Sequence, residues 1–172
     1  ISKARNRQEL EKALKLAARF DRRVLVERGI SPREIEISVL GNTLVECTVP
    51  GEIVPGDEFY TYKDKYESGD PEIAIPAPLS EAQTSLLRQY AVTAFQAIDG
   101  AGLARVDFLI DKTTGKAYFN EINTMPGFTE ISMYPKLWLY SGLTYAELVN
   151  RLVELALERK AEQDETIRKY ED

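Results

Sequence analysis

The sequence predicts an α+β fold in which a largely antiparallel sheet is flanked by helices. Two segments, residues 33–40 and 105–110, alternate apolar and polar residues with the period of a strand. Each runs into a turn-forming sequence, at residues 41–42 and 111–115, so each is expected to form a hairpin with the segment that follows. Because strands joined by short turns pair antiparallel, the sheet is expected to be mostly antiparallel.

Three stretches have apolar residues at helical spacing and begin at residues that can cap a helix. Asn6 is followed by Glu9 three residues later, and Thr144 by Glu147, both in the pattern of a capping box, and Ser80 caps the middle helix. The expected helices span residues 6–20, residues 80–98 and a segment from residue 144 onward. The expected apolar face of the first helix is Leu10, Leu14, Ala17 and Ala18, and that of the last helix is Leu148, Leu152, Leu155 and Ala156. The middle helix is expected to bury Ala82, Leu86, Tyr90, Thr93, Ala94 and Ala97.

The remaining segments predict shorter elements. Residues 22–27 are expected to form a strand that leads, through Gly29 and Pro32, into a hinge between two lobes, and residues 43–49 form the return strand of the first hairpin. Residues 50–78 contain many Gly and Pro residues, and three tyrosines there alternate with lysines, which predicts a long loop. That loop is either a lid over a phosphate-bearing cleft or an Ω-loop pinned by its tyrosines.

Composition excludes several classes of function. The chain has 172 residues, a net charge of -6 and no histidine, so nucleic-acid binding by a basic face is not expected. Cys47 is the only cysteine, which fits a reducing compartment and, together with the lack of histidine, excludes Ser-His and Cys-His dyads and ordinary zinc sites. No apolar run has membrane-spanning length, and the first residues lack the apolar core of a secretory signal.

The second hairpin carries the candidate chemistry. Arg105 and Asp107 share one face of its first strand, and Glu121 and Asn123, with Phe119, share one face of its second, opposite Tyr118, Asn120 and Ile122. If the register brings the two polar faces together, two carboxylates and an amide oxygen form a hard-oxygen set that suits Mg²⁺, beside an arginine that suits an anion or a developing oxyanion. The alternative is an ordinary solvated face. The Met-Pro-Gly sequence that follows favours a site, because backbone amides in a rigid turn can face a ligand.

Five blocks of sequence together resemble the D-alanine–D-alanine ligases of the ATP-grasp superfamily. They are Val-Glu-Arg-Gly-Ile (26–30), Arg-Glu-Ile-Glu (33–36), Phe-Tyr-Thr-Tyr-Lys-Asp-Lys-Tyr (59–66), Ala-Arg-Val-Asp-Phe (104–108) and Asn-Glu-Ile-Asn-Thr-Met-Pro-Gly-Phe-Thr (120–129). The resemblance implies an ATP-grasp fold and ATP-dependent ligation of two D-alanines through an acyl phosphate, for peptidoglycan synthesis in the bacterial cytoplasm.

The resemblance also implies how a nucleotide would bind. Glu27 and Ile30 match the hinge whose backbone groups bind the adenine edge, and Phe59 matches an aromatic residue that packs on adenine. Glu34 matches the carboxylate that holds the ribose hydroxyls. Lys65 matches a lid lysine that contacts the ATP phosphates.

Metal and substrate roles follow from the same resemblance. Asp107, Glu121 and Asn123 match the ligands of Mg²⁺ or Mn²⁺, with two ions expected. The catalytic and substrate-binding positions implied are Arg105 and the backbone amide of Gly127 at the oxyanion, Tyr66 in selecting an amine nucleophile, and Ser132 and Met133 at the carboxylate of the second D-alanine.

The resemblance covers only the carboxy-terminal part of the family's chain. Residues 1–28 match a remnant of the small ATP-grasp lobe, and residues 29–172 match the large catalytic lobe with a lid at about 55–78. The chain is therefore expected to be inactive alone, to need the missing amino-terminal part and, when intact, to form a homodimer. Two alternatives remain open, namely another ATP-grasp carboxylate–amine ligase and a non-catalytic ATP-binding module.

Overall fold

The computed structural model describes residues 1–54 and 72–166, and these fall into two compact units, Ile1–Ser31 and Pro32–Asp172. The first unit contains helix α1 (Arg7–Ala17), which begins as predicted. The Asn6 side chain accepts a hydrogen bond from the backbone N–H of Glu9 at 2.9 Å, and the Glu9 carboxylate accepts one from the Arg5 N–H at 2.7 Å. The assignment of residues 1–28 to a small ATP-grasp lobe stays a prediction.

The strand predicted at residues 22–27 does not form. No residue from 22 to 31 has strand structure, and Leu25 and Val26 are 82% and 60% exposed. A strand is stabilised by hydrogen bonds to a neighbouring strand, and no strand of the described chain pairs with this segment. The prediction was wrong because local alternation does not supply that partner.

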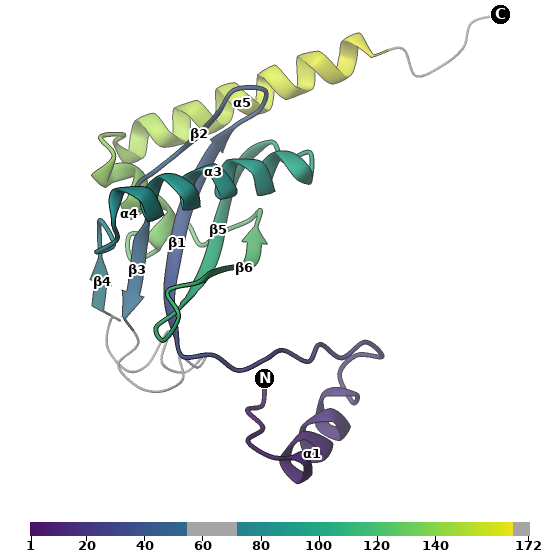
Figure 1. Ribbon diagram of the computed structural model, residues 1–172. Coiled ribbons are helices and arrows are strands. Elements are labelled where there is room, and N and C mark those ends of the chain that lie inside the picture. The colour runs from purple at the N-terminus through teal and green to yellow at the C-terminus, as the bar shows by residue number, and fades with distance from the viewer. Residues whose placement is uncertain (55–71, 167–172) are drawn as a thin grey trace, which may run out of the picture. The chain divides into compact units, whose positions relative to one another are not determined.

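The second unit is built on one sheet (Figure 1), in which all the pairings are antiparallel. The predicted fold class is therefore confirmed. The strands follow the order β4-β3-β1-β5-β6, and β2 also pairs with β1. Their bounds are β1 (Pro32–Gly41), β2 (Val45–Cys47), β3 (Gly51–Val54), β4 (Glu72–Ala74), β5 (Gly102–Asp111) and β6 (Ala117–Asn123).

Strands β3 and β4 lie inside the segment predicted to be a loop, so that prediction was wrong at both of its ends. They have only four and three residues, which is too short to show a period in the sequence. Their register is set by pairing instead, because Gly51 and Ile53 lie opposite Glu36 and Glu34 of β1. The rest of the proposed lid, residues 55–71, lies outside the described residues.

Helix α3 (Glu81–Ala97) covers one face of the sheet and begins with the predicted cap at Ser80. The helix face predicted to be buried was wrong. The buried residues are Leu87, Ala91 and Phe95, whereas Leu86 is 43% exposed. Two overlapping series of apolar residues run along this helix one position apart, and spacing alone does not distinguish them. Beneath α3 lie the side chains of one face of β1 and β5, namely Ile35, Ile37, Val39, Ala104, Val106, Phe108 and Ile110.

Helices α4 (Met133–Tyr140) and α5 (Tyr145–Glu165) pack on the other face of the sheet around Leu40. The predicted Thr144–Glu147 capping box is present, and Leu148 and Leu155 of the predicted face are buried, although Ala156 is exposed. The apolar cluster is made of Leu40, Tyr134, Trp138, Leu148 and Leu155, with Leu103 packed against it.

Helix α4 packs so closely against β3 that there is no room for a side chain at Gly51. A Cβ there would lie 2.9 Å from Leu137 Cδ2 and 3.0 Å from Met133 Sδ. Buried hydrogen bonds tie the same helix to the central strand, since Tyr134 Oη donates to the Val39 carbonyl at 3.0 Å and Ser38 Oγ donates to the Tyr134 carbonyl at 3.2 Å. The sheet therefore holds α4 at a fixed distance and orientation.

Candidate active site

The turn of the second hairpin fixes the register of β5 and β6. The Asp111 carboxylate accepts hydrogen bonds from the backbone N–H groups of Thr113 and Thr114, at 2.8 and 3.4 Å. These bonds hold the pKa of Asp111 below its usual range. Gly115 adopts the left-handed conformation predicted for it, with φ of 68°. The closed turn then aligns the two strands residue by residue.

That register brings the predicted polar faces together. Arg105 lies opposite Asn123, and Asp107 lies opposite Glu121. Within β5, Arg105 grips Asp107 with two parallel hydrogen bonds, from Nε to Oδ1 at 2.8 Å and from Nη2 to Oδ2 at 2.7 Å. This fork-to-carboxylate geometry is among the stronger polar contacts in proteins. The convergence inferred from strand alternation is present.

Glu36 of β1 is a member of this cluster that the sequence analysis did not single out. It lies directly opposite Asp107 across the β1–β5 ladder, and its Oε2 is 3.2 Å from Arg105 Nε. Glu36 is 6% exposed and Asp107 is 9% exposed. Alternation along residues 33–40 puts Glu34 and Glu36 on one strand face, but nothing local in the sequence pairs that strand with residues some 70 positions away.

The charges in the cluster act together on Arg105. Burial by itself would lower the pKa of the Arg105 guanidinium. The hydrogen bond to Asp107 and the charges of Glu36, Asp107 and Glu121 outweigh burial, and the pKa of Arg105 is raised well above its ordinary value. Arg105 thus stays charged, and the carboxylates near it outnumber its single positive charge.

A β-bulge beside the cluster changes which aromatic side chain shares its face. Phe108 lies opposite Phe119, but the next pair along is Asp107 with Glu121, so Asn120 is the extra residue. The expected strict alternation was therefore wrong. Phe119 points to the core face, where its ring meets Phe108 edge-on with centroids 6.1 Å apart. Tyr118, opposite Leu109, takes the face of the polar cluster instead.

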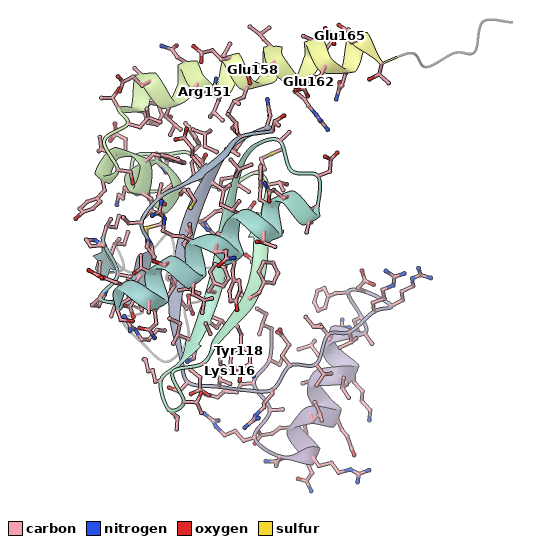
Figure 2. The ribbon with its side chains drawn as sticks, turned by 45° about the horizontal axis from the view of Figure 1, so that its top comes forward. Lys116, Tyr118, Arg151, Glu158, Glu162 and Glu165 are labelled. Atoms are coloured by element: carbon pink, nitrogen blue, oxygen red, sulfur yellow. The ribbon has the colours of Figure 1, made fainter. Side chains whose placement is uncertain are left out.

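Tyr118 is held at the turn end of the hairpin by a neighbouring cation. Lys116 Nζ lies 5.0 Å from the centre of the Tyr118 ring, and both side chains are labelled at this end of the hairpin in Figure 2. Tyr118 is 37% exposed. Its ring thus offers an apolar surface at the edge of the polar cluster.

The loop after β6 is tied back on itself. Asn123 Oδ1 accepts a hydrogen bond from the Met125 N–H at 3.1 Å, and Ser132 Oγ accepts one from the Thr129 N–H at 3.0 Å. A Cβ on Gly127 would lie 2.9 Å from that Ser132 Oγ, so the loop closes only with glycine there or with a shift. Met133 is 5% exposed and packs in the core at the start of α4.

Several predicted site residues are not placed beside the cluster. Glu27 and Ile30 belong to the first unit, and the polar cluster belongs to the second. Phe59, Lys65 and Tyr66 lie outside the described residues. Glu34 does share the face of Glu36, two residues earlier on β1.

Comparison with known proteins decides the family. The family model for the D-ala D-ala ligase C-terminus matches residues 1–154. The chain belongs to this family. No helix in the described ranges is both long and apolar enough to cross a bilayer.

Relatives in this family are similar in sequence to this chain along almost its whole length. The D-alanine–D-alanine ligase of Heliobacterium modesticaldum is 57% identical over 162 residues, which cover 94% of this chain and 44% of that protein. The ligase of Ruminiclostridium cellulolyticum is 53% identical over 99% of this chain and 45% of its own length. This chain therefore spans less than half the length of the relatives it matches.

Solved structures show the same fold. The D-alanine–D-alanine ligase from Coxiella burnetii superposes with a TM-score of 0.81 at 40% identity, covering 94% of this chain and 42% of that one. The VanG D-Ala:D-Ser ligase from Enterococcus faecalis gives a TM-score of 0.75 at 33% identity, covering 87% and 43%. The ATP-grasp fold predicted from the resemblance is confirmed by these neighbours.

The donor set of this family member fits a divalent cation. Asp107 and Glu121 are carboxylates in register, and Asn123 adds an amide oxygen at the next position on the same face. Among residues 1–54 and 72–166, no three His, Cys, Asp or Glu side chains gather as a metal site. The predicted set contains only two such residues, because its third ligand is an amide.

Proposed function

We propose that this chain is the ATP-binding and cation-binding catalytic part of a ligase that joins two D-alanines into D-alanyl-D-alanine. The observation that carries the proposal is the polar cluster on β5 and β6, where Asp107, Glu121 and Asn123 stand in register beside Arg105. Identities above 50% to D-alanine–D-alanine ligases over more than 90% of the chain support it.

The proposed chemistry has two steps. The carboxylate of the first D-alanine attacks the γ-phosphorus of ATP, giving an acyl phosphate and ADP. The amine of the second D-alanine then attacks the acyl carbon, loses a proton, and expels phosphate. Both steps require positive charge near phosphoryl oxygens and donors near an oxyanion, rather than a protein nucleophile. A chain without histidine and with one cysteine suits such a reaction.

The residues of the cluster divide these tasks. Asp107, Glu121 and Asn123 would hold Mg²⁺ or Mn²⁺, and two ions are proposed. When bound, the cations neutralise charge on the transferring phosphoryl oxygens. Arg105 stays protonated at any physiological pH and donates to the oxyanion formed at the acyl carbon, together with the N–H of Gly127.

Other residues are proposed to bind nucleotide and substrate. The backbone of Glu27 and Ile30 and the ring of Phe59 bind adenine, Glu34 binds the ribose, and Lys65 reaches the phosphates. Ser132 and the backbone of Met133 hold the carboxylate of the second D-alanine, and Tyr66 favours an amine as nucleophile.

We also propose that this chain acts as part of a longer protein. That protein is proposed to form a homodimer and to act in the cytoplasm. A second candidate differs only in the nucleophile. The fold is shared with a D-Ala:D-Ser ligase at a TM-score of 0.75, so D-serine as the second substrate is the alternative.

A chimera tests the proposal. This chain replaces the matching segment of the Heliobacterium modesticaldum ligase, and the purified chimera is assayed for ADP release and dipeptide formation with D-alanine, or with D-alanine plus D-serine. The expected product is D-alanyl-D-alanine, and Asp107→Asn is expected to abolish it. A folded chimera that releases no ADP with either substrate would refute the proposal, while preferential D-Ala–D-Ser formation would favour the alternative.

A further inference from the structure

Arg105 lies between two buried carboxylates that belong to neighbouring strands. Glu36 and Asp107 are directly opposite each other in the β1–β5 ladder and are 6% and 9% exposed. Like charges at directly opposite positions destabilise a sheet, and a buried carboxylate requires a partner. One guanidinium lies beside both, because the Arg105 Nε–H donates to Asp107 Oδ1 at 2.8 Å and the same Nε forms an ion pair, without a hydrogen bond, with Glu36 Oε2 at 3.2 Å.

The two carboxylates are not equivalent partners. Asp107 receives both arms of the guanidinium fork, whereas the contact to Glu36 is longer and is made by Nε. Asp107 is also a proposed cation ligand, and a cation on its oxygens competes with Arg105 for the same lone pairs. Glu36 is not a proposed ligand and comes from a different strand. Its contact with Arg105 therefore survives a change of partner at Asp107.

We propose that Glu36 is a positioning residue that keeps Arg105 in the site when Asp107 turns its oxygens to a cation. The inference rests on the proposed function of Asp107. It gives Arg105 two states: in one it contacts both Asp107 and Glu36, and in the other Glu36 holds Nε while Nη2 is free to meet an oxyanion. Without Glu36, the nearby Glu121 carboxylate would attract the guanidinium, but Glu121 is exposed and belongs to the cation site.

The competing interpretation is that Glu36 is only one half of a structural ion pair. The sheet offers a matched example on its other face, where Arg33 donates to Glu52 at 2.8 and 2.6 Å and Glu52 is 8% exposed. Neutralising either glutamate would remove a buried charge from an ion pair that joins β1 to a neighbouring strand. Only Glu36 is expected to control the mobility of Arg105.

The test replaces the cation by a substitution. Asp107→Asn removes the charge that grips Arg105, as a bound cation would, and the side-chain Nε–H of Arg105 is followed by ¹H–¹⁵N NMR in the 172-residue chain, with Arg105→Lys assigning the signal. We expect a slowly exchanging Nε–H in the wild type and in Asp107→Asn. In the Glu36→Gln/Asp107→Asn double variant, we expect hydrogen exchange to be at least about tenfold faster. Glu52→Gln is expected to leave the signal unchanged.

Two results would overturn the inference. One is loss of the protected Nε–H signal in Asp107→Asn alone, because Glu36 would then not be holding Arg105. The other is survival of the protected signal in the double variant, because another group would then be holding it. The comparison contains no metal or nucleotide. A separate Mg²⁺ titration of the wild-type chain, read from the same spectrum, shows whether Asp107 binds a cation. A failure of the proposed function would therefore appear in the titration and not in the hydrogen-exchange comparison of the variants.

Discussion

The two faces of strands β1 and β5 carry opposite chemistry although both are buried along much of their length. Toward α3, Ile37 and Val106 are fully buried among apolar neighbours. On the other face, Glu36 and Asp107 are almost as well buried but charged. Burying an apolar side chain stabilises the fold, whereas burying a carboxylate costs free energy that a paired arginine only partly returns. The second face therefore has an arrangement that stability alone does not explain, and that the proposed binding chemistry would explain.

The same contrast occurs along a single strand face. At one end of β1 and β5, Leu40 and Leu103 meet the helices α4 and α5. Four residues further along each strand, Glu36 and Asp107 occupy the same face. Between them, Ser38 is fully buried and hydrogen-bonded to Tyr134 of α4. The change from apolar to charged residues thus occurs where the apolar packing of α4 and α5 ends.

Removing a large side chain from the apolar face gives the largest expected effect on stability. Phe108→Ala should lower the free energy of unfolding by about 3–5 kcal/mol, because the ring is 1% exposed and its loss leaves a cavity. Chemical denaturation measures it. Leu109→Ala, the next residue and on the opposite, partly exposed face, is the matched control and should cost clearly less. Equal costs would mean that the two faces do not differ as described.

Filling the space at Gly51 tests how closely α4 is seated on the sheet. Gly51→Ala should destabilise the chain by about 1–3 kcal/mol, since the new methyl group would press on Leu137 and Met133. Gly29→Ala is the control, because nothing lies within 4 Å of a Cβ there. Thermal unfolding of both variants would show the difference. A neutral Gly51→Ala would contradict the close packing of α4.

Stability at alkaline pH tests the contact of Tyr134 with β1, which lies between the apolar and the charged residues on the α4 face of the sheet. Burial raises the pKa of Tyr134, although the neighbouring Trp138 side chain lowers it in part. A raised folded pKa means that the stability is fully present below the unfolded pKa of about 10 and is lost as the pH rises above it. Denaturation midpoints from pH 9 to 11 should therefore fall, and fall less in Tyr134→Phe. An identical decline in both proteins would assign the effect to other groups.

The smallest expected effect concerns the start of α5. Thr144→Ala removes the cap that accepts the Glu147 N–H, and also the hydroxyl that donates to the Glu147 carboxylate. We expect a loss of about 1 kcal/mol in the free energy of unfolding. The pKa of Glu147 is held below its usual range by Thr144, so the part of the loss that comes from the Glu147 carboxylate should disappear as the pH falls through the folded pKa, while the part from the N–H cap stays. A denaturation series at neutral and acid pH would show whether the difference between the two proteins narrows, and an unchanged difference would contradict the carboxylate's part.

The sequence predicted the convergence of the polar side chains well because its information was local. The turn from Asp111 to Gly115 and the alternation of the flanking strands placed Arg105, Asp107 and Asn123 together without knowledge of the rest of the chain. The ligase resemblance then implied roles that spacing alone could not, and those roles stay predictions.

What the sequence did not predict depended on distant contacts or on broken periodicity. Glu36 joined the cluster through the pairing of β1 with β5, which no local pattern encodes. The bulge at Asn120 reversed the faces of Tyr118 and Phe119, and two equally apolar series made the buried face of α3 ambiguous. The strand expected at residues 22–27 lacked a partner among the described strands.

The most direct test of the polar face is a calorimetric titration of the chain with ADP and Mg²⁺. Asp107→Asn is compared with Asp111→Asn, which changes a carboxylate on the same strand at the exposed turn and keeps an acceptor for the Thr113 N–H. We expect magnesium-dependent binding in the wild type and in Asp111→Asn, and at least a tenfold loss, about 1.4 kcal/mol, in Asp107→Asn. Binding that survives Asp107→Asn unchanged would contradict a cation site at the centre of the hairpin.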